Sequence, residues 1–571
     1  MSVEMPHYRP EFLRAIVDMG SNGIRFSISS LQPPTQRIMP TLYQHRVGIS
    51  LYDAQYSADG RRIPIDEKTM AAVVSSYKQF KRTCEDFGVP QNNITVLATE
   101  ATRTAVNSEA FRGRIKAKVG WDVTMLPKEE EGRVGAMGVA SSLPEVSGLV
   151  MDLGGGSTQL SWLVKNRDGG EVRMPGSGAV SMPYGAAAMS RRLADAERSG
   201  TTAQLKDEIR TAVQNAYASL MVPKYLDDAA KANGGFTLYL SGGGFRGWGY
   251  VLMSQHRVSP YPIPVINGFK ASRNEFLSTD QVKAAAAASL EHGEGQDELF
   301  RISERRAGQV PAVAFLVNVL AEALPHIKEV RFCQGGVREG FLFSSLSSDV
   351  KAQFPLVVAT ESVAKATSPL PVVALLQAAL PKDLDRDAAK AFAPDRLEAF
   401  ANLIYYHSSH SKDLQASAAL RCTTSGVLAG VHGILHESRT LIALLLCARW
   451  GGSVPPTDEQ FKPSLEQLVE SPWTLWWINY IGAVAGLIAS VYPAGVVAGA
   501  ERLKLSTKWD NDDKGKPLLV LRAVVSSDVD DEVFGVEAKA IEKVGKRKRW
   551  IGGRDGIGHK VEVEASVANK G

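Results

Sequence analysis

Two short stretches of the sequence combine residue types that bind phosphate. Each runs from an apolar segment through an aspartate and a glycine-rich turn with hydroxyl residues into a second apolar segment; they are 15-AIVDMGSNGIRFSIS-29 and 149-LVMDLGGGSTQLSW-162. A glycine-rich turn between two strands can direct several backbone N–H groups at one anion. Glycine also permits unusual backbone angles and a close approach of the ligand. The repetition predicts a molecule built from two similar halves around one site.

The polar side chains of these turns divide into phosphate donors and cation ligands. Asp18 and Asp152 end their strands, and a carboxylate repels phosphate, so we expect both to hold a divalent cation or its water shell. A plain tight hairpin with a capped acid is the alternative interpretation of either turn taken alone. Phosphate contacts are predicted for Gly20, Ser21, Asn22, Gly23 and Arg25 in the first turn and for Gly154, Gly155, Gly156, Ser157 and Thr158 in the second.

The segments around the turns alternate between strand and helix patterns. Apolar residues recur at helical spacing over 66–88, a buried strand follows at 94–103, and a second α/β half begins at Leu149. From about Phe354 the pattern becomes helical, and 501–526 is typical of a hairpin. The predicted domains are therefore two α/β domains at 1–142 and 143–350, a helical domain at 351–500 and a small α+β domain at 501–571.

Composition indicates an ordinary globular chain of several domains. The 571 residues are 44% hydrophobic and 22% charged, and the net charge of +4 argues against a polycation made for nucleic acid. The four cysteines show no CxxC spacing, which excludes a disulfide scaffold or a zinc ribbon and favours a reducing compartment. The first residues form no apolar signal segment. We therefore expect a cytoplasmic protein that does not bind DNA.

Two segments have alternative interpretations. Residues 471–500 carry no charge, and their length would suffice to span a membrane. Pro493 and Asn479 interrupt the run, so a helix buried in a helical domain is the preferred interpretation, with no membrane span. The basic segment 543–560 fits either a solvated strand pair or a nuclear signal or nucleic-acid patch.

Six segments together resemble the Ppx/GppA phosphatases, which are exopolyphosphatases and guanosine pentaphosphate phosphohydrolases. They are 15-AIVDMGSN-22, 98-ATEATRTAVN-107, 128-KEEEGRVGAMGV-139, 150-VMDLGGGSTQLS-161, 240-LSGGG-244 and 335-GGVREG-340. The resemblance covers residues 12–345 strongly and 355–500 loosely. It implies two actin-like (RNase-H-like, ASKHA) α/β domains facing a cleft, followed by a helical HD-like domain and a small α+β domain.

The resemblance also implies roles for individual residues. Glu131 matches the catalytic glutamate that activates water, although acids are also favoured at a helix start by the helix dipole. Arg103 matches an arginine of the phosphate cleft, where a planar bidentate donor suits a phosphoryl group; a surface salt bridge is the alternative. Asp152, with Asp18, would hold Mg²⁺, and Gly243 and Gly244 match glycines that a bound adenine or ribose passes closely.

Several residues depart from the family pattern. Gln159 stands where the hydrolases usually have a glutamate, which removes a negative charge and weakens the case for metal binding and hydrolysis. Gly23 and Arg25 replace the residues typical of bacterial hydrolases, and Arg25 adds positive charge that favours tight nucleotide binding. No HD dipeptide occurs in the sequence, so we predict no second, metal-dependent phosphohydrolase site.

Two classes of function follow from these motifs. In the first, the protein is a Mg²⁺-dependent exopolyphosphatase or guanosine pentaphosphate or nucleoside triphosphate phosphohydrolase. In the second, which the resemblance implies, it is a regulator that binds ATP, GTP or a polyphosphate in the same cleft and relays mitochondrial status to the nucleus by sequestering a regulatory protein partner. The regulator with a retained cleft and slow hydrolysis is our expectation, and a homodimer stays open.

Overall fold

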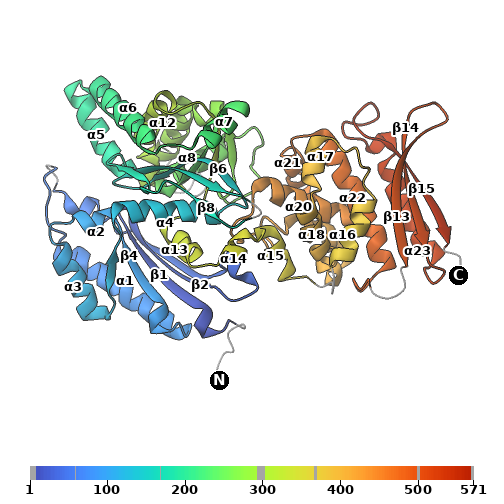
Figure 1. The fold of residues 1–571 in the computed structure, drawn as a ribbon, viewed down its shortest axis with the longest axis horizontal. Coiled ribbons are helices and arrows are strands. Elements are labelled where there is room, and N and C mark those ends of the chain that lie inside the picture. Colours follow the sequence, from blue (N-terminus) through green and yellow to red (C-terminus); the bar gives the residue numbers. More distant parts are fainter. Residues whose placement is uncertain are drawn as a thin grey trace. The chain divides into compact units, whose positions relative to one another are not determined.

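The computed structural model describes residues 8–57, 60–166, 169–291, 302–364, 369–497 and 502–567 (Figure 1). The chain divides into two compact units. The first consists of Met1–His256, Val265–Pro355 and His432–Ile434, and the second of Arg257–Pro264, Leu356–Val431 and Leu435–Gly571. The domain boundaries expected from the sequence at 142, 350 and 500 remain predictions.

The first sheet of the first unit has the strand order β3-β2-β1-β4-β5. The strands β1, β2 and β3 are antiparallel neighbours, whereas β4 and β5 continue the sheet parallel to β1. Helix α1 packs on it through Tyr77 and Phe80, whose rings contact Phe26 of β2. The strands are β1 (Leu13–Gly20), β2 (Gly23–Ser30), β3 (Thr41–Val47), β4 (Ile94–Ala98) and β5 (Val123–Met125), and the helices are α1 (Glu67–Asp86), α2 (Glu100–Thr104) and α3 (Ser108–Val119).

The second sheet repeats this arrangement. Strands β6 and β7 are antiparallel, and β10 and β12 continue the sheet parallel to β6 in the order β12-β10-β6-β7. This is the duplication that the two glycine turns predicted. The strands are β6 (Val146–Leu153), β7 (Thr158–Lys165), β8 (Val172–Arg173), β9 (Val180–Met182), β10 (Phe236–Ser241), β11 (Lys270–Ser272) and β12 (Ile327–Phe332).

Several helices accompany the second sheet, and two of them position site residues. Helix α8 starts directly after β10, and the short α11 precedes the buried α12 in the sequence. These helices are α5 (Ala186–Ser199), α6 (Thr202–Ser219), α7 (Lys224–Ala232), α8 (Gly242–Ser254), α9 (Arg273–Phe276), α10 (Thr279–Glu291), α11 (Glu304–Ala307) and α12 (Val310–Ala323).

Helices α4 (Lys128–Ser141) and α13 (Val337–Ser344) cross at very close range because glycines lie at the contact. A Cβ atom on Gly340 would lie 1.8 Å from the Val134 carbonyl oxygen, and one on Gly138 would lie 2.4 Å from that of Gly336. Two buried cations, Arg37 and Lys165, donate to carbonyls at the C-terminal end of α4. These contacts fix the helix whose first turn carries Glu131.

The second unit is helical and ends in a small sheet. Strands β13 and β14 form an antiparallel hairpin, and β15 joins parallel to β14 after α23. The elements that follow α14 (Ser348–Ala352) of the first unit are α15 (Pro355–Glu361), α16 (Pro369–Ala378), α17 (Arg386–Ala391), α18 (Pro394–Leu403), α19 (Lys412–Arg421), α20 (His436–Arg449), α21 (Phe461–Glu466), α22 (Pro472–Val491), β13 (Leu503–Asn511), β14 (Pro517–Val525), α23 (Asp531–Val544) and β15 (Lys560–Val567).

Helix α22 lies in the uncharged segment 471–500. By length and composition it could span a membrane, but 83% of its most apolar window is buried inside the structure. It packs against α20 and α23 of the same unit. Such burial is typical of a core helix.

Candidate functional site

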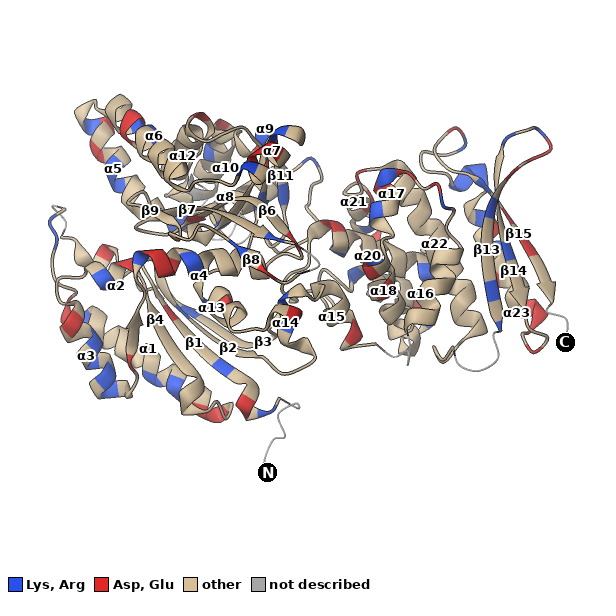
Figure 2. Ribbon diagram, in the orientation of Figure 1, with Lys and Arg blue, Asp and Glu red and all other residues tan. Residues whose placement is uncertain are grey.

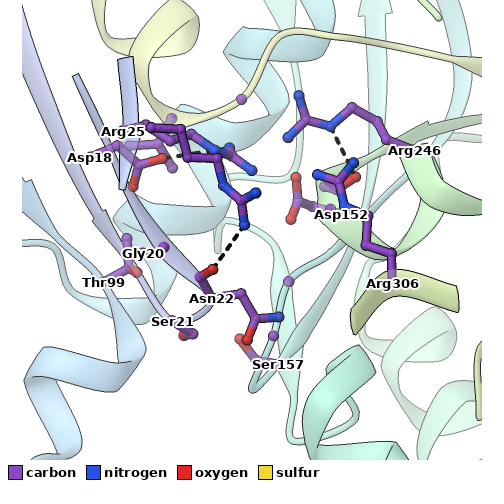
Figure 3. A pocket seen from close by; sticks show the side chains of 18 of the residues that line it. Asp18, Gly20, Ser21, Asn22, Arg25, Thr99, Asp152, Ser157, Arg246 and Arg306 are labelled. Atoms are coloured by element: carbon purple, nitrogen blue, oxygen red, sulfur yellow. Dashed lines mark hydrogen bonds and ion pairs between the residues drawn. The ribbon is translucent and has the colours of Figure 1, made fainter. Parts of the chain in front are cut away.

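One pocket in the first unit brings the two glycine turns together (Figure 3). Its cavity of about 120 Å³ receives Asp18 and Arg25 from one half and Asp152, Arg246 and Arg306 from the other. The predicted site residues that line it are Asp18, Gly20, Ser21, Asn22, Gly23, Arg25, Glu131, Asp152, Gly154, Gly155, Ser157 and Gly243. Four predicted residues lie outside this lining, namely Arg103, Gly156, Thr158 and Gly244.

The first turn joins β1 to β2 with only two residues between them. Gly23 has a φ of 153°, and a side chain there would meet the Val47 carbonyl oxygen at 3.0 Å, so glycine is required at this position. The Arg46 guanidinium donates to the Asn22 carbonyl at 3.0 Å. The backbone of the turn is therefore held in place while the turn lines the pocket.

The second turn joins β6 to β7 and packs tightly against the start of α5. The Gly154 amide donates to the Ser157 carbonyl at 3.0 Å, and a Cβ atom on Gly185 would come within 2.4 Å of the Gly155 carbonyl carbon. Thr158 is fully buried, and its hydroxyl donates to the Asp152 carbonyl at 2.8 Å. Thr158 thus supports the turn from behind, whereas Ser157 lies at the pocket.

Two carboxylates from opposite halves lie at the pocket. Asp18 is 6% exposed, and its Oδ1 atom is buried without a hydrogen-bond partner among the described residues. Burial raises the pKa of Asp18, opposed by Arg25, whose Nη1 lies 3.7 Å from Oδ2. Asp152 accepts a hydrogen bond of 2.5 Å from the Ser241 hydroxyl. An orphaned buried carboxylate oxygen of this kind fits a bound cation.

Glu131 lies in the first turn of α4, whose acidic start is red in Figure 2. Arg103 of α2 donates to its Oε2 atom at 3.2 Å. Burial raises the pKa of Glu131 to about 7, although Arg103 acts to lower it. Neighbouring Glu130 instead points to solvent and pairs with Arg133. Arg103 therefore orients Glu131, and it is this glutamate of the acidic run that faces the pocket.

A second, smaller cavity of about 30 Å³ lies on the other side of Glu131. Its polar lining consists of Glu131, Asp152, Gln159 and Ser161. This volume is sufficient for a water molecule, and the site offers it several polar partners. The Gln159 amide donates to the Ser157 hydroxyl at 2.9 Å, which couples the residue that departs from the family pattern to the second turn.

Four arginines at the pocket were not predicted from the sequence: Arg46 of β3, Arg246 of α8, and Arg305 and Arg306 of α11. Burial, together with the charges of Arg25 and Arg306, lowers the pKa of Arg246 to about 9. Burial likewise lowers the pKa of Arg306 to about 10, with Arg46 and Arg25 adding to the effect. Arginines that repel one another in a buried pocket favour a polyvalent anion as ligand.

The sequence carried only weak signals for these arginines. Arg246 interrupts the glycine run 242-GGGFRGWG-249, and Arg305 and Arg306 are adjacent in 303-SERRAGQ-309. The glycines of the first stretch fit G-x-G-x-x-G, but that pattern assigns no role to its arginine, and the second stretch matches no motif. Only the fold brings β3, α8 and α11 to one pocket.

The described residues contain no group of three or more histidine, cysteine, aspartate or glutamate side chains that could hold a metal ion. Asp18 and Asp152 offer two carboxylates, which is the set that Mg²⁺ uses when phosphate oxygens and water complete its shell. The histidines of the helical region lie elsewhere. His432 contacts the Ser141 hydroxyl at 2.8 Å, and His436 contacts Tyr261 at 2.7 Å.

Comparison with known proteins assigns the class. The model of the Ppx/GppA phosphatase family matches residues 30–349, and the model of the RTG2 C-terminal domain matches residues 354–568. The chain belongs to the Ppx/GppA phosphatase family. This confirms the resemblance inferred from the six motifs.

Two relatives and one solved structure are similar to this chain. The chain is similar to Retrograde regulation protein 2 of Saccharomyces cerevisiae, with 40% identity over 497 residues, 85% of this chain and 81% of that protein. It is also similar to the guanosine-5'-triphosphate,3'-diphosphate pyrophosphatase of Photobacterium profundum, with 38% identity over 150 residues, 26% of this chain and 28% of that one. The Ppx/GppA enzyme of Aquifex aeolicus is a solved structure with 21% identity and a TM-score of 0.44, covering 58% of this chain and 99% of that one.

Proposed function

We propose that the chain is a regulator of mitochondria-to-nucleus retrograde signalling that binds the phosphate chain of a nucleotide or polyphosphate in the pocket between its two glycine turns. Similarity to Retrograde regulation protein 2 over most of both chains supports the signalling role. In this proposal the protein acts in the cytoplasm, and occupancy of the pocket controls its binding to a regulatory protein.

The observation that carries the ligand assignment is the convergence of arginines on the two turns. Arg25 and Arg46 come from one half, and Arg246 and Arg306 come from the other. A chain of phosphates would neutralise their mutual repulsion and accept bidentate hydrogen bonds from their guanidinium groups. Gly154 and Gly155 of the second turn line the same pocket.

We also propose that the pocket retains a slow hydrolytic activity. A carboxyl with a pKa of about 7 suits a general base at neutral pH. Glu131 would take a proton from a water held beside Asp152 and Gln159. Mg²⁺, held by Asp18 and Asp152, would supply charge neutralisation at the phosphates. Because Gln159 replaces a carboxylate of the hydrolases, we expect slow release of phosphate.

An enzyme without a signalling role is the less favoured alternative. The 40% identity to a regulatory protein extends through the region that matches the RTG2 C-terminal domain, far beyond the residues around the pocket. A dedicated hydrolase would need only the first of the two matched regions. We therefore propose regulation as the main function of the chain and hydrolysis as a secondary one.

The test is complementation of a fungal strain that lacks its retrograde regulator. We expect Arg246→Met to abolish the retrograde transcriptional response, because the pocket loses a side chain that binds phosphate. Arg210→Met serves as the control and should complement fully, because Arg210 is partly exposed, pairs with Asp207 and is not among the residues that line the pocket. A normal response with Arg246→Met at equal protein level would contradict the proposal.

A further inference from the structure

Arg305 links the two halves of the first unit at the rim of the pocket. It lies on α11 of the second half, and its Nη2 atom contacts Asn22 Oδ1 at 2.7 Å, Ser50 Oγ at 2.8 Å and Asp53 Oδ2 at 2.8 Å. Its Nη1 atom also contacts the Asn22 carbonyl at 3.4 Å. These four acceptor atoms belong to three residues of the first glycine turn and the loop 48–56. Arg305 therefore contacts the first glycine turn and the partly exposed loop 48–56 at once.

The loop 48–56 is tied to the same glycine turn. The Tyr52 amide donates to the Ser21 carbonyl at 3.0 Å, so movement of the turn reaches the loop directly. A second arginine from the other half, Arg191 of α5, contacts Asp53 Oδ1 at 3.2 Å. The Arg191 guanidinium lies over the Tyr56 ring, 4.4 Å from its centroid. Asp53 thus receives one arginine on each carboxylate oxygen.

We propose that Arg305 is a further phosphate-binding residue that Asp53 holds in reserve, so that a phosphate chain entering the pocket takes Arg305 from Asp53 and releases the loop 48–56. The inference deepens the proposed function and rests on it. Arg305 already lines the pocket beside Asn22, Arg46 and Arg306. A phosphate at the first turn would offer its guanidinium group a more highly charged acceptor than a single carboxylate.

Because phosphate and Asp53 compete for Arg305, the state of the loop 48–56 depends on whether the pocket is occupied. Asp53 is 45% exposed, so losing Arg305 leaves it hydrated and still paired with Arg191. The energetic difference between the paired and released states is therefore small, as is usual for partly exposed ion pairs. Because this energetic difference is small, a bound ligand can readily shift the equilibrium from the paired to the released state. In this arrangement the loop 48–56 carries the signal from the pocket to the protein surface.

Calorimetric titration of the full chain with tripolyphosphate tests the competition. Asp53→Asn keeps the shape of the side chain but weakens its hold on Arg305, so we expect affinity to rise about threefold. Arg305→Met should lower affinity, and the double variant should bind like Arg305→Met alone. The control is Glu322→Gln, which breaks a comparably exposed pair with Lys206 and should leave affinity unchanged.

Two outcomes would overturn the inference while leaving the proposed function intact: unchanged or weaker binding by Asp53→Asn, or an equal gain in the Arg305→Met background. Absence of tripolyphosphate binding by the unmodified chain would instead overturn the proposed function itself. Hydrogen exchange gives an independent readout. Saturating tripolyphosphate should speed exchange of amides in 48–56, and this change should vanish in Arg305→Met; slower exchange would contradict release of the loop.

Discussion

At the scale of single residues, the environment of Glu131 decides what chemistry the pocket can perform. Its carboxyl is largely buried, and Arg103 is the cation that contacts it. Burial outweighs that cation, and the pKa rises from 4.5 to about 7. The group is therefore poised between acid and base near neutral pH.

The pH dependence of phosphate release follows from this shift. Glu131 must be ionised to accept a proton from water, so we expect the rate to rise with pH and level off above about 7. Glu131→Gln should abolish release but keep ligand binding within about threefold, since the amide retains the shape. Phosphate release measured from pH 5 to 9 checks this. A pH-independent rate, or release by Glu131→Gln, would contradict the assignment.

Stability should respond to the same group with the opposite sign. Because the folded state holds the Glu131 proton up to about pH 7 while the unfolded state loses it near 4.5, the free energy of unfolding from this group falls as pH rises between these values. Urea titrations at pH 5 and 8 should show a smaller decrease for Glu131→Gln than for the unmodified chain. An equal decrease would show that Glu131 is not perturbed by folding.

Gln159 is the residue through which we propose that hydrolysis is slowed. It is 8% exposed and faces the small cavity beside Glu131 and Asp152. Gln159→Glu would add a carboxylate there. We therefore expect the Mg²⁺ concentration for half-maximal phosphate release to fall about tenfold, equivalent to roughly 1.4 kcal/mol. Release measured over a range of Mg²⁺ concentrations checks this. Gln159→Met is the control that removes the amide without adding charge, and an equal effect of both changes would exclude the charge as the cause.

At the scale of elements, the crossing of α4 and α13 holds the helix that carries Glu131. Gly340→Ala would place a methyl group 1.8 Å from the Val134 carbonyl oxygen, so the helices must separate. We expect a loss of about 1–3 kcal/mol in the free energy of unfolding of the first unit. Thermal denaturation followed by circular dichroism measures it.

Gly135→Ala on the same helix is the matched control. A Cβ atom at Gly135 meets nothing within 4 Å, and alanine in a helix is favoured over glycine by about 0.5–1 kcal/mol. This variant should be as stable as the unmodified chain or slightly more stable. Equal destabilisation by both variants would show that Gly340 is not needed for the close approach of α4 and α13.

The elements around the turns could be predicted from local sequence, because their patterns are local. The apolar spacing over 66–88 corresponds to α1, and the Asp66 side chain accepts from the Thr69 amide as an N-cap should. The strand–turn–strand units correspond to β1–β2 and β6–β7. Both depend on residues within a few positions of one another.

The rest of the pocket could not be predicted, because its residues meet only through the fold. Arg46, Arg246 and Arg305 belong to three elements that no local pattern connects. Arg103 was expected at the phosphates from its motif, yet it contacts Glu131 and the Leu126 carbonyl. The direction of the Arg103 side chain at the end of the short helix α2 is set by packing, which a motif does not encode.

At the scale of the whole molecule, the lining of the pocket predicts how it selects a ligand. Among the described residues that line it, none is aromatic and Val337 is the one large apolar side chain. A purine base would therefore find no aromatic side chain to stack on there. We expect tripolyphosphate, ATP and GTP to bind within about fivefold of one another, and orthophosphate much more weakly. A competition assay checks this, and a strong preference for one base would contradict it.

The central claim is that a phosphate chain binds between the two glycine turns. Its most direct test is calorimetric titration of the full chain with tripolyphosphate and Mg²⁺, with phosphate release followed in the same samples. We expect saturable binding that weakens with salt, slow release, and loss of binding in Arg246→Met but not in Arg210→Met. No binding, or equal binding by both variants, would contradict the claim.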